Sequence, residues 1–252
     1  MRKVFLLALL VSPIALAQSV SVETHSLMRL PSSTSVLQLE RLDVADYGTL
    51  LIPATISQVT VDELHLGREA RIAIVPGNTA LQLQVRQAQL EHGSQITSRG
   101  APGTHEKPAR AGRDLTLRIH SLTAEALSLD ARGGAGAQGY AGLDGANGED
   151  PGCTWGSAGR GFNGDNGGDG LPGAAGATVR VELPQDFPAE NIKVWVDGGP
   201  GGLAGTAGKP GEGGQSKGCV VYRADGGDKG RPGLEGQPGA AGPAGSVTIQ
   251  RL

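Results

Sequence analysis

Apolar and polar residues alternate over most of the first half of the chain, and this period of two is typical of half-buried β-strands. The alternation returns in four segments; the first three starts lie about 22 residues apart, and an insertion delays the fourth. These segments begin at residues 36, 59, 81 and 115. A repeat of this length is typical of proteins in which stacked units bury a core that no single unit could bury alone.

The repeat predicts an all-β fold, and specifically a short β-solenoid of about six turns. We expect a fifth turn at residues 178–197 and a last strand at residues 246–252, because both segments contain the same alternation. A β-sandwich is the alternative, since it also contains short alternating strands. The solenoid is favoured because the long insertions leave and re-enter the repeat at one position, which would stack the loops side by side.

Glycine supplies 42 of the 252 residues and occupies every third position in four runs. The runs cover residues 133–148, 161–176, 199–214 and 227–245. This triplet period resembles the Gly-X-Y repeat of collagen-like proteins, in which three parallel chains bring glycine to a crowded axis. Both ends of each loop return to one place in the repeat, so we expect neighbouring runs to be antiparallel.

Residues 133–245 also resemble the glycine-rich bundles of polyproline II helices found in the snow flea antifreeze protein and in phage tail-fibre tip adhesins. The resemblance implies that the stacked Gly-X-Y loops form an antiparallel polyproline II bundle within one chain. Three residues per turn give each such helix one stripe of glycine, which lets neighbouring backbones approach closely. A monomer is therefore expected, and a collagen-like trimer is the alternative.

The N-terminus has the pattern of a secretory signal. Arg2 and Lys3 precede an apolar run, and Ala15-Leu16-Ala17 matches a small-residue cleavage site. No later apolar stretch is long enough to span a bilayer, so we expect a periplasmic or extracellular protein that does not cross the membrane. The expected organisation is a signal peptide (1–17), an N-terminal lead-in (18–34), solenoid turns one to four (35–132), a first Gly-X-Y hairpin (133–177), a fifth turn (178–197), a second hairpin (198–245) and a final strand (246–252).

The chain has two cysteines, Cys153 and Cys219, and each lies at the middle of a glycine-rich loop. Cys153 follows Gly133 by twenty residues, and Cys219 follows Gly198 by twenty-one. Stacked loops of equal length would bring the two cysteines together, and an exported chain favours a disulfide between them. Two free thiols, or pairing between chains, are the alternatives.

Apolar side chains gather around these cysteines although aromatic residues make up only 3% of the chain. An apolar patch at a protruding tip is typical of a contact site, and an aromatic ring there suits a sugar or a partner protein. The alternative is a small apolar knot that closes a bundle without any other core. The candidate tip residues are Trp155, Phe162, Val220, Val221 and Tyr222.

Other classes of site have little support in the sequence. The net charge of −3 argues against binding to nucleic acid. The five histidines lack metal-ligand spacing, no nucleophile motif is present, and we expect no catalytic residues, no metal site and no cofactor. Binding of Ca²⁺ by loop carboxylates is the alternative, and the candidates are Asp144, Glu149, Asp150, Asp165, Asp169, Asp225 and Asp228.

The sequence thus predicts an exported, non-enzymatic structural or adhesive module that presents a glycine-rich bundle to a partner. The expected partner is a surface polysaccharide or an envelope or matrix protein. Three alternatives stay open: an ice- or crystal-surface-binding protein, a trimeric collagen-like protein and a β-helix carbohydrate-active enzyme.

Overall fold

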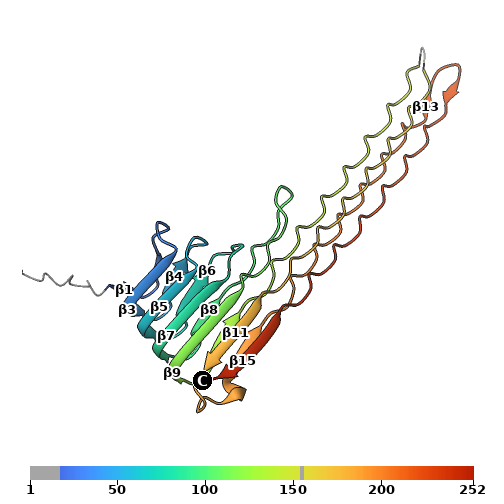
Figure 1. Ribbon diagram of the computed structural model, residues 1–252. Helices are drawn as coiled ribbons and strands as arrows, with labels where there is room; N and C mark the ends of the chain where they lie inside the picture. The colour runs from blue at the N-terminus through green and yellow to red at the C-terminus, as the bar shows by residue number, and fades with distance from the viewer. Residues whose placement is uncertain (1–17, 154–155) are drawn as a thin grey trace, which may run out of the picture.

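The computed structural model describes residues 18–153 and 156–252, so the predicted signal segment lies outside the described residues. The chain passes alternately through two parallel sheets (Figure 1). The seven-stranded sheet contains, in spatial order, β1 (Ser19–Val22), β3 (Val36–Val44), β5 (Gln58–Leu66), β7 (Leu81–Leu90), β9 (Leu115–Ala124), β11 (Thr178–Leu183) and β15 (Ser246–Arg251). The six-stranded sheet contains β2 (Leu27–Arg29), β4 (Thr49–Ile52), β6 (Arg71–Ile74), β8 (Gln95–Thr97), β10 (Leu127–Asp130) and β12 (Ile192–Trp195).

The remaining elements are short. The two-stranded antiparallel sheet consists of β13 (Lys217–Gly218) and β14 (Arg223–Ala224), and a single 3-10 turn, η1, covers Ala189–Asn191. β1 and β2 lie within the segment 18–34, which the sequence had assigned to a lead-in. The described part of the chain contains no α-helix, and thus no helix of the length and apolarity needed to cross a bilayer.

The apolar face of both sheets forms one core. Buried residues from both sheets belong to a single cluster, because strands pair in register and place apolar side chains in rows; the last strand, β15, is exposed throughout. In β5, Val61 and Leu64 are both buried although they are three residues apart. Their partners in β7, Val85 and Ala88, have the same spacing, so the strands bend together and both halves of each strand face the core.

The turns that lead from the first sheet to the second are also stacked. Four successive turns have a residue with positive φ at the same place, namely His25, Tyr47, Glu69 and Gly93. The amide of Tyr47 donates to the carbonyl of Arg68 in the next turn at 2.8 Å, and the amide of Glu69 donates to that of His92 at 3.0 Å. Stacking therefore fixes a conformation that non-glycine residues rarely adopt.

One charged side chain is completely buried beneath these layers. Arg113 donates to the carbonyl oxygens of Thr79 at 2.7 Å, Ile56 at 2.5 Å and Pro53 at 3.3 Å, while its own backbone is bonded to Ser98. Desolvation by burial lowers the pKa of this guanidinium, and none of the carboxylates in residues 18–153 and 156–252 pairs with it. Arg113 thus ties the return of the shortest glycine-containing insertion to two earlier loops.

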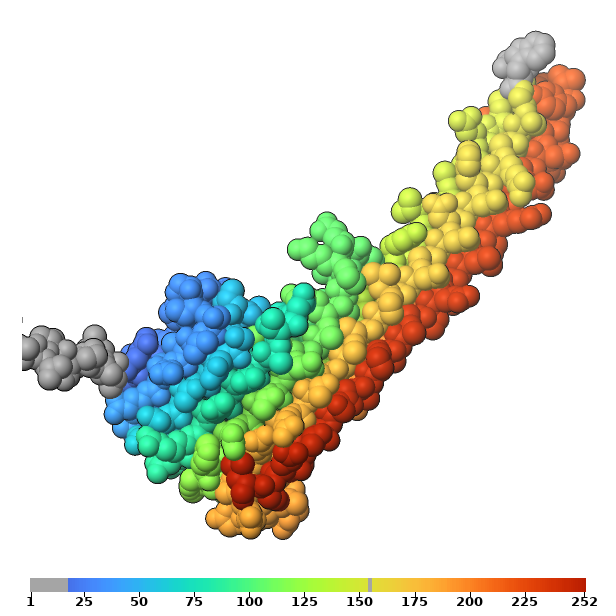
Figure 2. Space-filling model, in the orientation of Figure 1, coloured from blue at the N-terminus to red at the C-terminus, as the bar shows by residue number. Residues whose placement is uncertain are grey.

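Four glycine runs extend from the sheets as a long projection (Figure 1, Figure 2). We call them run one (133–150), run two (159–176), run three (198–215) and run four (227–245), and together the glycine projection. Their backbones are linked at every third residue. A side chain on these glycines has no space: a Cβ at Gly139 would lie 2.8 Å from the nitrogen of Gly205 and closer still to the carbonyl oxygen of Gly168.

Three pairs of runs are antiparallel. In runs one and two the amide of Gly168 donates to Tyr140, and three residues later the amide of Leu171 donates to Ala137. Runs two and three, and runs three and four, follow the same rule. Two other pairs are parallel, because Gly139 and Gly142 of run one donate to residues 203 and 206 of run three, and run two donates to run four in the same sense.

Side-chain acceptors accompany the parallel pairs. In run one Asp144 accepts from the amide of Lys209 at 2.7 Å, and in run two Asn166 accepts from the amide of Leu234 at 2.8 Å. Each acceptor belongs to a triplet Gly-X-Asp or Gly-X-Asn, and each donor directly follows a glycine of the parallel neighbour. The full set of pairs is Asp144–Lys209, Asn147–Glu212, Asp150–Gln215, Asn163–Arg231, Asn166–Leu234 and Asp169–Gln237.

The predicted fold class is therefore wrong. The sequence predicted a closed β-solenoid of about six turns and an antiparallel polyproline II bundle, whereas the described residues form two parallel sheets of seven and six strands, and the glycine runs pair in both directions. Period-two alternation identifies a strand and its buried face, but not how the sheets close. A glycine stripe permits close approach from either direction, so it does not specify antiparallel neighbours.

Candidate functional site

The far end of the glycine projection is built around a disulfide. Cys153 and Cys219 are bonded, with their Cα atoms 5.6 Å apart, as the equal loop lengths predict. Cys219 directly follows the hairpin strand β13, and its amide donates to the carbonyl of Tyr222 across the turn. The bridge thus joins the end of run one to the hairpin that connects runs three and four.

Three of the predicted tip residues lie together on this hairpin. Val220 is 105% exposed and Val221 91% exposed, so neither side chain packs into a knot. Tyr222 is partly covered, and its hydroxyl donates to the carbonyl of Gly152 at 3.2 Å. The hairpin therefore holds two free apolar side chains outward beside one anchored aromatic ring.

The other two predicted tip residues do not join this group. The amide of Phe162 donates to Ala146, which lies seven residues before Cys153, so its exposed ring belongs to the shaft of the projection rather than to its end. Trp155 lies outside the described residues. Phe162 was predicted at the tip because it lies only nine residues after Cys153 in the sequence. In the structure, run two turns back toward the sheets after the tip, so Phe162 lies on the shaft.

Three of the seven loop carboxylates that were the alternative candidates for calcium have other partners. Asp144, Asp150 and Asp169 each accept a backbone amide from a neighbouring run. Within residues 18–153 and 156–252, no group of three or more His, Cys, Asp or Glu side chains is placed to hold a metal ion.

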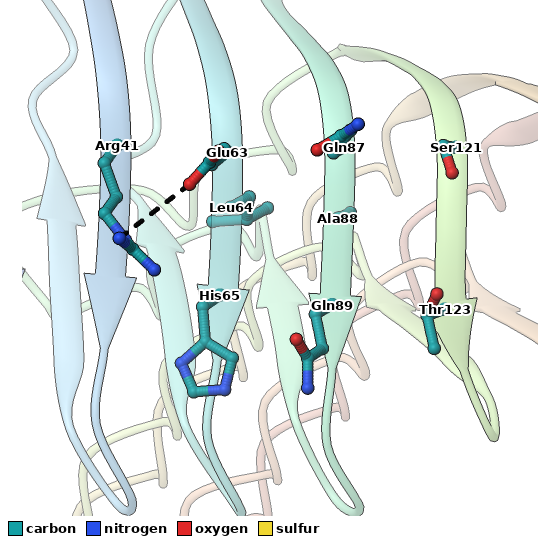
Figure 3. A pocket seen from close by; sticks show the side chains of 9 residues that line it. All are labelled: Arg41, Glu63, Leu64, His65, Gln87, Ala88, Gln89, Ser121 and Thr123. Atoms are coloured by element: carbon teal, nitrogen blue, oxygen red, sulfur yellow. Dashed lines mark ion pairs between the residues drawn. The ribbon is translucent and has the colours of Figure 1, made fainter.

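A second candidate, which the sequence did not single out, lies on the outer face of the seven-stranded sheet. A groove of about 320 Å³ crosses β3, β5, β7 and β9 (Figure 3). Its side chains form two rows because the strands pair in register: one row leads from Arg41 to Ser121, and the other ends at Gln89 and Thr123. The lining residues are Arg41, Glu63, Leu64, His65, Gln87, Ala88, Gln89, Ser121 and Thr123.

Charges in this groove are balanced across neighbouring strands. Arg41 lies 3.9 Å from Glu63. The ring of His65 lies 2.9 Å from a carboxylate oxygen of Asp43 on one side and 3.6 Å from Glu91 on the other. Arg41 is therefore matched by a carboxylate and His65 lies between two, so the groove has no excess of positive charge.

Just beyond the groove, the turn that follows β5 contains a stronger ion pair. Arg68 donates two side-chain hydrogen bonds to the carboxylate of Asp46, at 3.0 and 2.7 Å. Hydrogen bonds from the Arg68 side chain and backbone hold the pKa of Asp46 below its usual value, and the same side-chain bond raises the pKa of Arg68. Arg68 is thus committed to Asp46 and adds no free positive charge to the groove.

The junction of the sheets and the glycine projection contains a buried carboxylate. Asp130, at the end of β10, accepts hydrogen bonds from Arg132 at 2.9 and 2.8 Å, and Arg99 lies 3.7 Å away. Burial raises the pKa of Asp130, but the bonds from Arg132 and the charge of Arg99 outweigh burial, and the pKa is lowered. Asp130 therefore stays ionised and fixes the direction in which run one leaves the sheet.

The signal for the groove was present in the sequence. Polar residues occupy the outward positions of successive repeats, and aligning the repeats would have placed Asp43, His65 and Gln89 in one row. Taken singly, each of these residues is a polar residue at an outward position of a strand. Only an alignment of the repeats with one another could show that the three share a surface. Comparison with known proteins adds no family: no family model, no curated protein and no solved structure matches this chain.

Proposed function

We propose that this protein is an exported adhesive module whose glycine projection carries an apolar tip to a partner on a surface. The partner class is a surface polysaccharide or an envelope or matrix protein. The observation that carries the proposal is the pair of fully exposed valines, Val220 and Val221, at the far end of a projection that is hydrogen-bonded along its length.

The projection is suited to contact a partner at a distance from the sheets rather than to enclose a ligand. Run one covers residues 133–150, and a chain of that length extends over at most roughly 60 Å. Bonds to neighbouring runs recur at every third residue, so the tip is held at a distance from the sheets without a large apolar core. A rigid carrier lowers the entropy lost when its tip binds.

The tip offers contact energy on a small area. Complete burial of a valine side chain contributes about 1.5–3 kcal/mol, so covering both valines would supply most of a moderate affinity. The disulfide and the Tyr222 hydroxyl hold the hairpin in place, so the hairpin loses less conformational entropy when it binds a partner. The disulfide also supports export, since such bonds persist in oxidising compartments.

Binding to immobilised glycans and matrix proteins tests the proposal. The wild-type protein should bind at least one of them on an array, and the double variant Val220→Ser, Val221→Ser should lose tenfold or more in affinity because its apolar contacts are removed. The matched control is Leu203→Ser, Leu234→Ser, which removes two side chains that are 69% and 71% exposed on the shaft. Equal loss in both variants would assign the contact to the shaft, and the absence of any binding would contradict the adhesive function.

A further inference from the structure

We propose that the groove on the outer face of the seven-stranded sheet binds a neutral polysaccharide chain. This site is separate from the tip of the glycine projection, and the proposal does not depend on the function proposed for that tip. The groove crosses four strands and lies on the part of the molecule with the larger core (Figure 3).

The hydrogen-bonding groups of the groove are available to a ligand. Within the described residues, the side chains of Gln87, Gln89, Ser121 and Thr123 make no hydrogen bond to another side chain or to the backbone. Amides and hydroxyls both donate and accept, which is the chemistry that recognises sugar hydroxyls. All four side chains are exposed, so water satisfies them in the free protein and a ligand rich in hydroxyl groups can replace that water.

The arrangement of these groups fits a chain rather than a single small molecule. Register places Gln87 beside Ser121 and Gln89 beside Thr123, so polar groups recur from strand to strand. The spacing of neighbouring strands is about 4.8 Å, comparable to the length of one hexose unit. A polysaccharide that lies across the strands would therefore meet a pair of polar side chains on each strand.

The charges select against acidic chains. Arg41 faces Glu63, and His65 lies between Asp43 and Glu91, so an incoming carboxylate would find no unmatched cation. The same carboxylates can accept hydrogen bonds from neutral hydroxyls. A neutral chain is thus favoured over a uronic acid polymer.

The groove continues along the strands into a second hollow of about 420 Å³. The two hollows share Gln89 and Thr123, and the second adds Glu125 and His92, which lie 3.2 Å apart. Gln89 and Thr123 therefore lie where the two hollows meet, and a chain that occupies both hollows would contact this pair. Substitution of this shared pair should weaken binding more than substitution at either end.

Electrophoresis through gels that contain dissolved polysaccharide provides the test. The probes are dextran, laminarin and hydroxyethyl cellulose as neutral chains and alginate as the acidic comparison. At least one neutral chain should retard the wild-type protein, and Gln89→Ala, Thr123→Val should weaken that retardation at least threefold. The matched control is Gln82→Ala, Thr116→Val, which changes a pair with the same residue types and the same strand register outside the groove.

Several results would overturn the proposal. The proposal is wrong if no neutral chain retards the wild-type protein or if alginate alone retards it. It is also wrong if the groove variant loses less than threefold in retardation. An equal loss in the control variant would overturn it too, because it would show a general effect on the sheet. The tip variant Val220→Ser, Val221→Ser should retain the retardation; if it abolished binding while the groove variant bound normally, the polysaccharide site would belong to the tip.

Discussion

The two sheets and the glycine projection belong to one chain, but different interactions stabilise them. The sheets bury one continuous cluster that contains most of the leucine, isoleucine and valine in the described residues. The projection has almost no apolar core, and its covered positions are chiefly glycine and a few alanines such as Ala137. Stability in the first region comes from apolar area removed from water, whereas in the second it comes from backbone contacts that only glycine allows.

The difference shows where each region tolerates change. A core residue can be replaced by another apolar residue of similar volume at modest cost. Most glycines of the projection cannot be replaced by a residue with a Cβ unless a neighbouring backbone moves, whereas a Cβ at Gly168 would meet the ring of Tyr140. Outward side chains differ as well: in the projection Asn166 accepts an amide from a neighbouring run, whereas Gln87 and Gln89 on the outer face of the sheet line an open groove.

The largest effect is expected where the sheets depend on a polar contact. Arg113→Met keeps much of the side-chain volume but leaves the carbonyls of Thr79, Ile56 and Pro53 without this donor. A buried unsatisfied group costs about 1–3 kcal/mol, so the free energy of unfolding should fall by about 3–5 kcal/mol. Urea unfolding followed by far-UV circular dichroism measures this change.

Arg110→Met is the control for this prediction, since Arg110 is exposed on the same insertion and should change the stability little. An unchanged or higher midpoint in Arg113→Met would contradict the expectation. It would show that removing a desolvated charge outweighs the lost hydrogen bonds, and that the apolar cluster alone stabilises the sheets.

A smaller and more local effect is expected from a glycine of the projection. In Gly139→Ala the new methyl group would overlap the backbone of run two, and relief of the overlap should cost about 1–3 kcal/mol. Hydrogen exchange followed by mass spectrometry should show faster exchange in residues 133–176, while residues 59–96 stay protected. Gly218→Ala is the control, because no atom lies within 4 Å of its added Cβ. Equal loss of protection in the sheets would show that the two regions unfold as one unit.

Strands were the most predictable part of the structure. The alternation in residues 59–61 and 81–85 identified parts of β5 and β7 and their buried faces, because side-chain direction in a strand has a fixed period. The sequence did not give the sheet arrangement. Alternation does not report which strands pair, and the turn stack that aligns them depends on contacts between residues such as Tyr47 and Arg68, far apart in the chain.

The site was predicted only in part. Equal loop lengths were enough to pair Cys153 with Cys219, since chain length limits where a loop can reach. The groove and the position of Phe162 were not predicted, because both depend on which segments the folded backbone brings side by side. Asp144 and Asp169 were candidates for the alternative calcium site because a carboxylate offers the same oxygen atoms to a metal and to an amide, and in the structure each accepts an amide of the neighbouring run.

The smallest effect tests what sets the direction of the glycine runs. Each Gly-X-Asp or Gly-X-Asn triplet accepts an amide from its parallel neighbour, so Asn166→Leu should leave the amide of Leu234 exposed to water alone. One hydrogen bond contributes about 0.5–1.5 kcal/mol, so exchange of that amide should accelerate by up to about tenfold. Asn166→Asp keeps the acceptor oxygen and should exchange as the wild type does. The amide of Gly233 donates to Gly208 and serves as the internal reference in the same NMR spectra. If Leu234 and Gly233 accelerate together, the side-chain acceptor stabilises the whole of run four, including its antiparallel bonds to run three, rather than one bond.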